Sequence, residues 1–117
     1  MQDRPTATEL LDAMAADLFT EVREWVPRER RFRVLVLANL CAVIARELRA
    51  GEEHSRQDLA LFKALRESPA DDVREAAAVL AASIRLGDLD ARLPEVIEEL
   101  REHVARKLEI ARPGYAS

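Results

Sequence analysis

Apolar side chains recur every three or four residues along most of this chain, which is the spacing of one face of an α-helix. The first segment begins at Thr6, which stands three residues before Glu9 in the form of a capping box. Pro27 closes the segment, so the pattern predicts a helix over residues 7–25. Its apolar face consists of Ala7, Leu11, Met14, Leu18, Val22 and Trp25.

The second segment holds the longest apolar run of the chain, residues 34–45, interrupted by Asn39. It predicts a helix over residues 29–50, with Gly51 as the residue that ends it. Apolar residues cover most of its circumference, so we expect this second helix to be largely buried at the centre of a bundle. The alternative is that a second subunit covers part of it.

Three further helices are predicted over residues 56–67, 71–86 and 94–111. The third helix begins near Ser55 and Asp58 and ends before Pro69, Gly87 stops the fourth, and Pro94 occupies the first turn of the fifth. Alternation with a period of two residues, which would indicate strands, is absent. The fold class is therefore all-α, and we predict a five-helix bundle forming a single domain over residues 1–117.

The charge balance narrows the classes of partner. The chain has 117 residues and a formal net charge of -4, which argues against nucleic acid as a partner. The run over residues 34–45 is shorter than the roughly 20 residues a bilayer requires, so we expect no membrane span. A single cysteine, Cys41, fits a reducing compartment and a buried position, so a cytoplasmic location is predicted.

Conventional catalytic machinery is not visible in the sequence. His54 falls in a predicted polar loop and His103 on a polar helix flank, and both are most simply solvated residues. The glutamate four residues before His103 does not have the spacing of a di-metal Glu-x-x-His motif. No glycine-rich phosphate loop or nucleophile elbow occurs. We therefore predict no enzyme activity, no cofactor and no metal.

Asn39 is the most informative polar residue, because it interrupts an apolar stripe. A buried amide needs hydrogen-bond partners, and three are open: a helix end or loop, a register-fixing contact between subunits, or a ligand. Arg46 lies two turns further along the same predicted face. Arg33, Asn39 and Arg46 are accordingly the candidate cluster for a ligand or an interface.

Charge is distributed unevenly along the chain. Five arginines lie between Arg23 and Arg33, and six acidic residues lie between Asp88 and Glu102. These runs could be solvated, pair within the fold, or pair across a dimer or with another protein. Because 117 residues give little cover for so apolar a second helix, we predict a homodimer through that helix, with help from the first or the fourth.

Several short segments together carry a family resemblance. In chain order they are Arg4-Pro5-Thr6-Ala7, Phe32-Arg33-Val34, Ala38-Asn39, Ala45-Arg46-Glu47-Leu48, Ile84-Arg85-Leu86-Gly87 and Lys107-Leu108. The chain resembles a bacterial, all-helical family catalogued as a domain of unknown function. Its members look like stand-alone proteins or C-terminal attachments to kinases similar to aminoglycoside phosphotransferases, often encoded near acyl-CoA dehydrogenases.

That resemblance implies an auxiliary or protein-interaction role, with a phosphotransferase-like kinase or an acyl-CoA dehydrogenase as the partner. It transfers no catalytic residue to this chain. The competing hypothesis is a small-molecule binder, in which Arg33, Asn39 and Arg46 line a pocket for an acidic ligand such as an acyl-CoA. The binder requires a concave site beside the second helix.

Overall fold

The computed structural model describes residues 3–115, and every regular element in that range is helical. Two compact units divide the chain: the first unit extends to Gly51 and the second unit begins at Glu52. The all-α prediction is confirmed for residues 3–115. The prediction of one domain over residues 1–117 stays a prediction.

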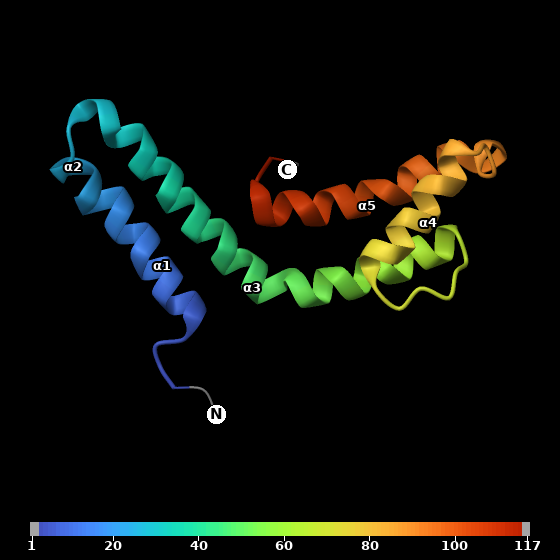
Figure 1. The fold of residues 1–117 in the computed structure, drawn as a ribbon, viewed down its shortest axis with the longest axis horizontal. Helices are drawn as coiled ribbons and strands as arrows, with labels where there is room; N and C mark the ends of the chain where they lie inside the picture. Colours follow the sequence, from blue (N-terminus) through green and yellow to red (C-terminus); the bar gives the residue numbers. More distant parts are fainter. Residues whose placement is uncertain (1–2, 116–117) are drawn as a thin grey trace. The chain divides into compact units, whose positions relative to one another are not determined.

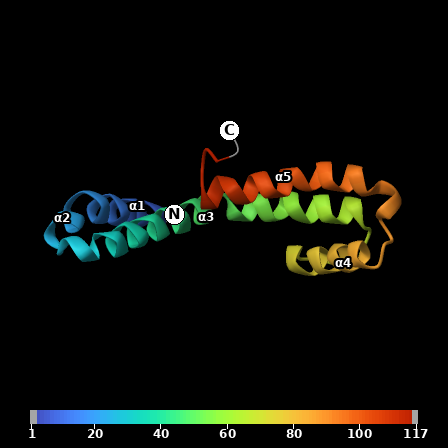
Figure 2. The same ribbon diagram turned by 90° about the horizontal axis from the view of Figure 1, so that it is seen from above.

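The first unit is a helical hairpin. Its first arm consists of α1 (Ala7–Asp17), a π-helical turn η1 (Leu18–Val22) and α2 (Arg23–Trp25). A 3-10 turn, η2 (Arg28–Arg30), follows Pro27 and leads into α3 (Arg31–Leu65), whose first half forms the second arm. The two arms lie side by side in both views (Figures 1 and 2). The predicted helix over residues 7–25 is thus confirmed, with one π turn inside it.

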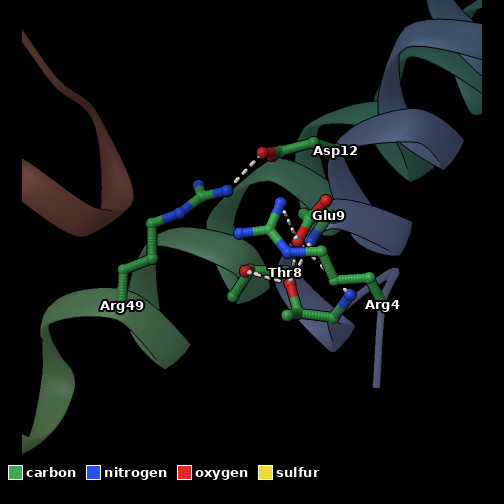
Figure 3. Close-up of polar contacts among 6 residues, drawn as sticks. Arg4, Thr8, Glu9, Asp12 and Arg49 are labelled. Atoms are coloured by element: carbon green, nitrogen blue, oxygen red, sulfur yellow. Dashed lines mark hydrogen bonds and ion pairs between the residues drawn. The ribbon is translucent and has the colours of Figure 1, made fainter. Parts of the chain in front are cut away.

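The capping box at the start of α1 is present. The Glu9 amide donates a hydrogen bond to the Thr6 hydroxyl at 3.2 Å, and the Glu9 carboxylate reaches back to the Thr6 amide at 3.5 Å. The Arg49 guanidinium of α3 donates a hydrogen bond to the Asp12 carboxylate of α1 (Figure 3). Because this hydrogen bond raises the pKa of Arg49 further, the guanidinium stays charged and ties the two arms together.

The predicted break between a second and a third helix is wrong, because α3 continues without interruption from Arg31 to Leu65. A glycine inside a helix costs only about 1 kcal/mol relative to alanine, which neighbouring interactions can offset. Just after Gly51, Arg56 pairs with Glu53 and approaches Glu52 within 3.7 Å, as helical neighbours do. The five predicted helices therefore become four in the described range, with α1 to α2 counted as one.

The second unit is built from the second half of α3, α4 (Val73–Arg85), the 3-10 turn η3 (Asp90–Arg92) and α5 (Leu93–Ala111). Asp72 caps α4 by accepting a hydrogen bond from the Glu75 amide at 2.8 Å, and Gly87, with a φ of 84°, follows its end. The predicted fourth and fifth helices are confirmed to within two residues at each end. The core consists of Leu61, Phe62, Leu65, Ala70, Ala76, Leu80, Leu89 and Val96.

The sequence predicts that the second helix is largely buried, and the structure does not confirm this. The first half of α3, which corresponds to that helix, is exposed on much of its surface. Only Val34, Ala38 and Ala45 are buried in this half among its apolar residues. The hairpin has one other arm, so the first unit by itself covers one side of α3 there. Within residues 3–115 no helix has the length and apolar character needed to cross a membrane.

Candidate functional site

The side of α3 that faces away from α1 carries an unusual row of exposed apolar residues. We call this row the open face, and it consists of Val36, Leu37, Leu40, Ile44 and Leu48. Their exposed fractions lie between 40% and 57%. The spacing of 37, 40, 44 and 48 follows the three- and four-residue steps of one helical stripe. A contiguous apolar stripe of this kind is typical of a surface that packs against another helix.

The other arm of the hairpin contributes exposed apolar residues too. Leu10 and Met14 of α1 are each about half exposed, at 50% and 52%. Trp25, at the end of this arm, is 72% exposed, and Phe32 at the start of α3 is 76% exposed. The first unit therefore presents apolar side chains on both of its arms.

An open groove lies between the two arms. Its volume is about 500 Å³, and Ala15, Ala16 and Phe19 line it from the first arm. Leu35, Ala38, Asn39 and Ala42 line it from α3. Small alanine side chains create the hollow, and the π-helical turn carries the aromatic wall, Phe19. Asn39 is the polar residue of a lining that holds no charged side chain, so the groove suits an apolar group better than an acidic one.

The three residues of the predicted polar cluster do not share one face of α3. Asn39 and Arg46 are seven residues apart, about two helical turns, and lie on the same side. Arg33 is six residues before Asn39 and falls on another side, next to the open face. Asn39 and Arg33 are exposed, whereas Arg46 is half-buried. The expectation that Asn39 is a buried amide is wrong for a single copy, because the groove leaves it open to solvent.

Cys41 is half-buried as a free thiol rather than fully buried.

The arginine-rich run of residues 23–33 is partly neutralised by its own acidic residues. Glu24 lies 3.5 Å from Arg23 and 3.8 Å from Arg31. The acidic run in the second unit behaves in the same way, with Arg92 on Glu95 and Arg101 on Glu98, each at 3.1 Å. Pairing within each run therefore accounts for part of both charge clusters.

A polar cluster that the sequence reasoning missed lies in the second unit, where α5 packs on α3. Asp58, only 8% exposed, accepts a hydrogen bond from the Arg106 Nε at 2.7 Å. The same oxygen lies 3.1 Å from the His103 Nδ1, without hydrogen-bond geometry. The His103 ring meets the Phe62 ring edge-on, with centroids 4.9 Å apart. This arrangement clamps the two helices, and every group in it has a neighbour within the fold.

Both histidines differ from their predicted solvated positions. His54 lies inside α3, not in a loop, and its Nε2 is 3.2 Å from the Glu109 carboxylate of α5. Its side chain is 16% exposed and that of His103 is 21% exposed. Asp58 and Phe62 lie on one side of α3, and His103 and Arg106 lie on one side of α5, but no sequence signal links the two pairs across the helices. The prediction that Asp58 helps to start a helix is wrong, since it lies within α3.

The outer side of α5 holds a second apolar hollow of about 460 Å³. Ile97, Leu100, Val104, Ala105 and Leu108 line it together with Arg101. The residue of α5 that the core buries most completely is Val96, at 1%, while Ile97 and Val104 are 51% exposed. Ile97 and Val104, seven residues apart and so on one side of α5, thus mark a surface rather than the inner side of this helix.

Among residues 3–115 there is no group of three or more His, Cys, Asp or Glu side chains placed to hold a metal ion. In the cluster of Asp58, His103 and Arg106 the guanidinium pairs with the carboxylate, while the His103 Nδ1 and the Arg106 Nη2 are buried without a hydrogen-bond partner among the described residues. The surfaces described for binding are the open face and the groove of the first unit, and the apolar hollow on α5 of the second unit.

Comparison with known proteins gives one match. Residues 24–115 match a family described as Domain of unknown function (DUF6285). The match covers the second arm of the hairpin and the whole described part of the second unit. No curated protein and no solved structure matches the chain.

Proposed function

Since the chain belongs to the DUF6285 family, whose function is unknown, we propose from its surfaces that it is an association module without catalysis of its own. The first unit binds another protein helix through the open face of α3. The second unit, which has the larger core, provides most of the stability of the fold. In the first instance the bound protein is a second copy of the chain, so the module is a homodimer.

The observation that carries this proposal is the exposure of five large apolar residues in one row of α3. Burying a leucine or isoleucine side chain fully stabilises a complex by about 1.5–3 kcal/mol, and these side chains are about half covered already. A dimer would bury the part of each side chain that is still exposed, for five side chains on each copy and ten in all. Leu10 and Met14 on α1 are also about half exposed, so the first arm offers further apolar surface, which supports the predicted contribution of the first helix.

Sedimentation equilibrium tests the homodimer. We expect the wild-type chain to be a dimer at high micromolar concentration, and Ile44→Lys to shift it to monomer because the ammonium would have to be desolvated at the interface. Leu86→Lys is the matched control, since Leu86 belongs to the second unit and is 78% exposed. A wild-type chain that stays monomeric at these concentrations contradicts the proposal.

The larger partner we propose is an enzyme of the kind that the resemblance implies, a phosphotransferase-like kinase or an acyl-CoA dehydrogenase, in the bacterial cytoplasm. The module would attach to it as an auxiliary part. Purified enzymes of both classes from the same genome test this in binding titrations. Saturable binding to one of them that Trp25→Ala weakens, while Leu86→Lys does not, supports the partner; no binding to either contradicts it.

The groove between the arms favours a second candidate function, the binding of a small ligand such as an acyl-CoA. Its apolar lining fits an acyl chain, with Asn39 at its polar position and Arg46 two turns further along α3 for an acidic group. Calorimetry with an acyl-CoA and with CoA alone tests this function. Binding of the acyl form that Ala42→Leu abolishes by filling the groove supports it, and equal or absent binding of both contradicts it.

A further inference from the structure

The open face has a charge pattern that specifies how a second copy would lie on it. Arg33, Leu40 and Glu47 are spaced by seven residues each, and seven residues make about two helical turns. The three side chains therefore lie on one line along α3. A positive charge stands at one end of this line, a negative charge at the other, and an exposed leucine at its midpoint.

Both charged residues are available for a partner. Arg33 and Glu47 are exposed, and within residues 3–115 neither forms an ion pair, whereas Arg23 and Arg31 of the same run both lie beside Glu24. The Glu47 side chain lies over the backbone of Gly51, where a Cβ would stand 2.6 Å from the Glu47 Oε1. Glycine at position 51 leaves room for this carboxylate beside the helix.

We propose that two copies of the chain pack α3 on α3 in antiparallel orientation, crossing at Leu40. A two-fold axis through this point places Leu40 on Leu40 of the second copy. It also places Arg33 opposite Glu47 of the second copy, and Glu47 opposite its Arg33. Val36 and Leu37 then face the stretch around Ile44 of the other copy, so the apolar residues lie between two ion pairs.

A parallel pairing does not have this complementarity. In that orientation Arg33 lies beside Arg33 of the second copy, and Glu47 beside its Glu47, so like charges meet at both ends of the interface. The charges thus select between two orientations that bury the same apolar residues. Ion pairs at the edge of an interface act mainly on orientation and specificity in this way.

This inference rests on the proposed homodimer, and charge reversal separates the two. Arg33→Glu and Glu47→Arg each replace two attractive pairs by two repulsive ones, so we expect the dimer dissociation constant to rise about tenfold for each. The double variant R33E/E47R restores both pairs, and its constant should return to within about threefold of wild type. In a parallel dimer neither single variant would weaken association, because the like-charge contacts would be of similar size before and after.

The control reversal uses a charge pair outside the open face. Glu98→Arg with Arg101→Glu exchanges two exposed partners on α5, which lie 3.1 Å apart. We expect the dissociation constant to stay unchanged. Sedimentation of the wild-type chain reports on the homodimer itself, and the failure of that dimer ends both proposals; a wild-type dimer without rescue in R33E/E47R ends the antiparallel pairing alone.

Disulfide cross-linking gives an independent measurement, made in a Cys41→Ala background. Leu40→Cys places two thiols at the two-fold axis, so mild oxidation should yield a covalent dimer. Leu37→Cys places them six residues apart, about 9 Å along the helix axis, so it should yield little. Equal cross-linking of both variants indicates a parallel pair and overturns the proposal, as does the absence of cross-linking by Leu40→Cys in a wild-type-like dimer.

Discussion

The two units of this chain are made of the same kind of helix but use their apolar residues differently. In the second unit, residues from α3, α4 and α5 form one continuous core around Leu80 and Val96. In the first unit, two arms bury Val34, Ala38 and Ala45 and leave the five apolar residues of the open face exposed. Three packed helices can enclose a core, whereas two can cover only the sides on which they meet.

This difference indicates where the chain needs a partner. Most of the stability of a helix in a protein comes from packing its apolar face rather than from its intrinsic propensity. The first unit obtains that packing on one side of α3 alone, although the sequence is apolar on both. A second copy would supply the missing layer, and the comparison can be tested by disturbing each unit in turn.

The largest effect is expected from a cavity in the core of the second unit. Leu80 is 3% exposed, so Leu80→Ala should lower the free energy of unfolding by about 2–5 kcal/mol at every protein concentration. Leu40, 49% exposed, gives the contrasting variant in the first unit. Leu40→Ala should cost less than about 0.5 kcal/mol in dilute solution and more as the protein concentration rises. Urea unfolding at two concentrations measures both, and equal losses for the two variants would contradict the contrast.

A smaller effect is expected from the polar clamp between α3 and α5. Asp58→Asn removes the carboxylate that accepts a hydrogen bond from the Arg106 Nε. It leaves the mostly covered guanidinium with the Glu102 carboxylate, 4.0 Å away, as its counter-charge. We expect a loss of about 1–3 kcal/mol in the free energy of unfolding. Glu98→Gln, at an exposed pair on the same helix, should change it by less than about 0.5 kcal/mol. A loss no larger than that of the control would show that the clamp adds nothing to stability.

The cap of α1 provides the corresponding test in the first unit. Thr6→Ala removes the hydroxyl that accepts a hydrogen bond from the Glu9 amide. It should lower the free energy of unfolding by about 1 kcal/mol. Hydrogen exchange localises the effect: amides of α1 should exchange faster, while those of α4 and α5 keep their rates. Thr20→Ala, whose hydroxyl donates to the Ala16 carbonyl within the same arm, serves as a comparison that leaves the cap intact. Uniform acceleration in both units would mean that they unfold together.

The smallest effect is a pH dependence at the start of α5. A hydrogen bond from Arg92 lowers the pKa of Glu95 below its ordinary value of 4.5. A carboxyl whose pKa is lowered by folding contributes stability above its unfolded pKa, and this contribution is lost as the pH falls through the folded pKa. Between pH 6 and pH 3, the urea midpoint of the wild-type chain should therefore fall slightly more than that of Arg92→Gln. Parallel curves would show that the pair is too solvated to matter.

The sequence predicts helices well here because their ends carry local signals. The side chains of Thr6 and Asp72 accept hydrogen bonds from backbone amides at the starts of α1 and α4. Pro94 stands in the first turn of α5, and Gly87 follows α4 with a positive φ. Gly51 is the exception, since its effect depends on what surrounds it. The charged neighbours after it sustain the helix, and the boundary between the two units still falls at this residue.

The candidate site could be predicted only in part. The apolar stretch around Leu40 was recognisable, but its exposure was not, because exposure depends on how many helices pack around it. Arg33 was singled out for a cluster with Asn39, yet helical geometry places it beside the open face instead. Asp58 and Arg106 are 48 residues apart in sequence, and no local pattern brings such a pair together.

The π-helical turn from Leu18 to Val22 has a consequence for relatives of this chain. A π turn accommodates one residue more than the α-helical turn it replaces, so the side chains after it are rotated relative to those before it. A relative one residue shorter between Ala16 and Trp25 would regain regular α-helical hydrogen bonding, and its counterpart of Phe19 would point elsewhere. Chain length across this short stretch would thus distinguish relatives that keep the aromatic wall from those in which the hollow is open at that end.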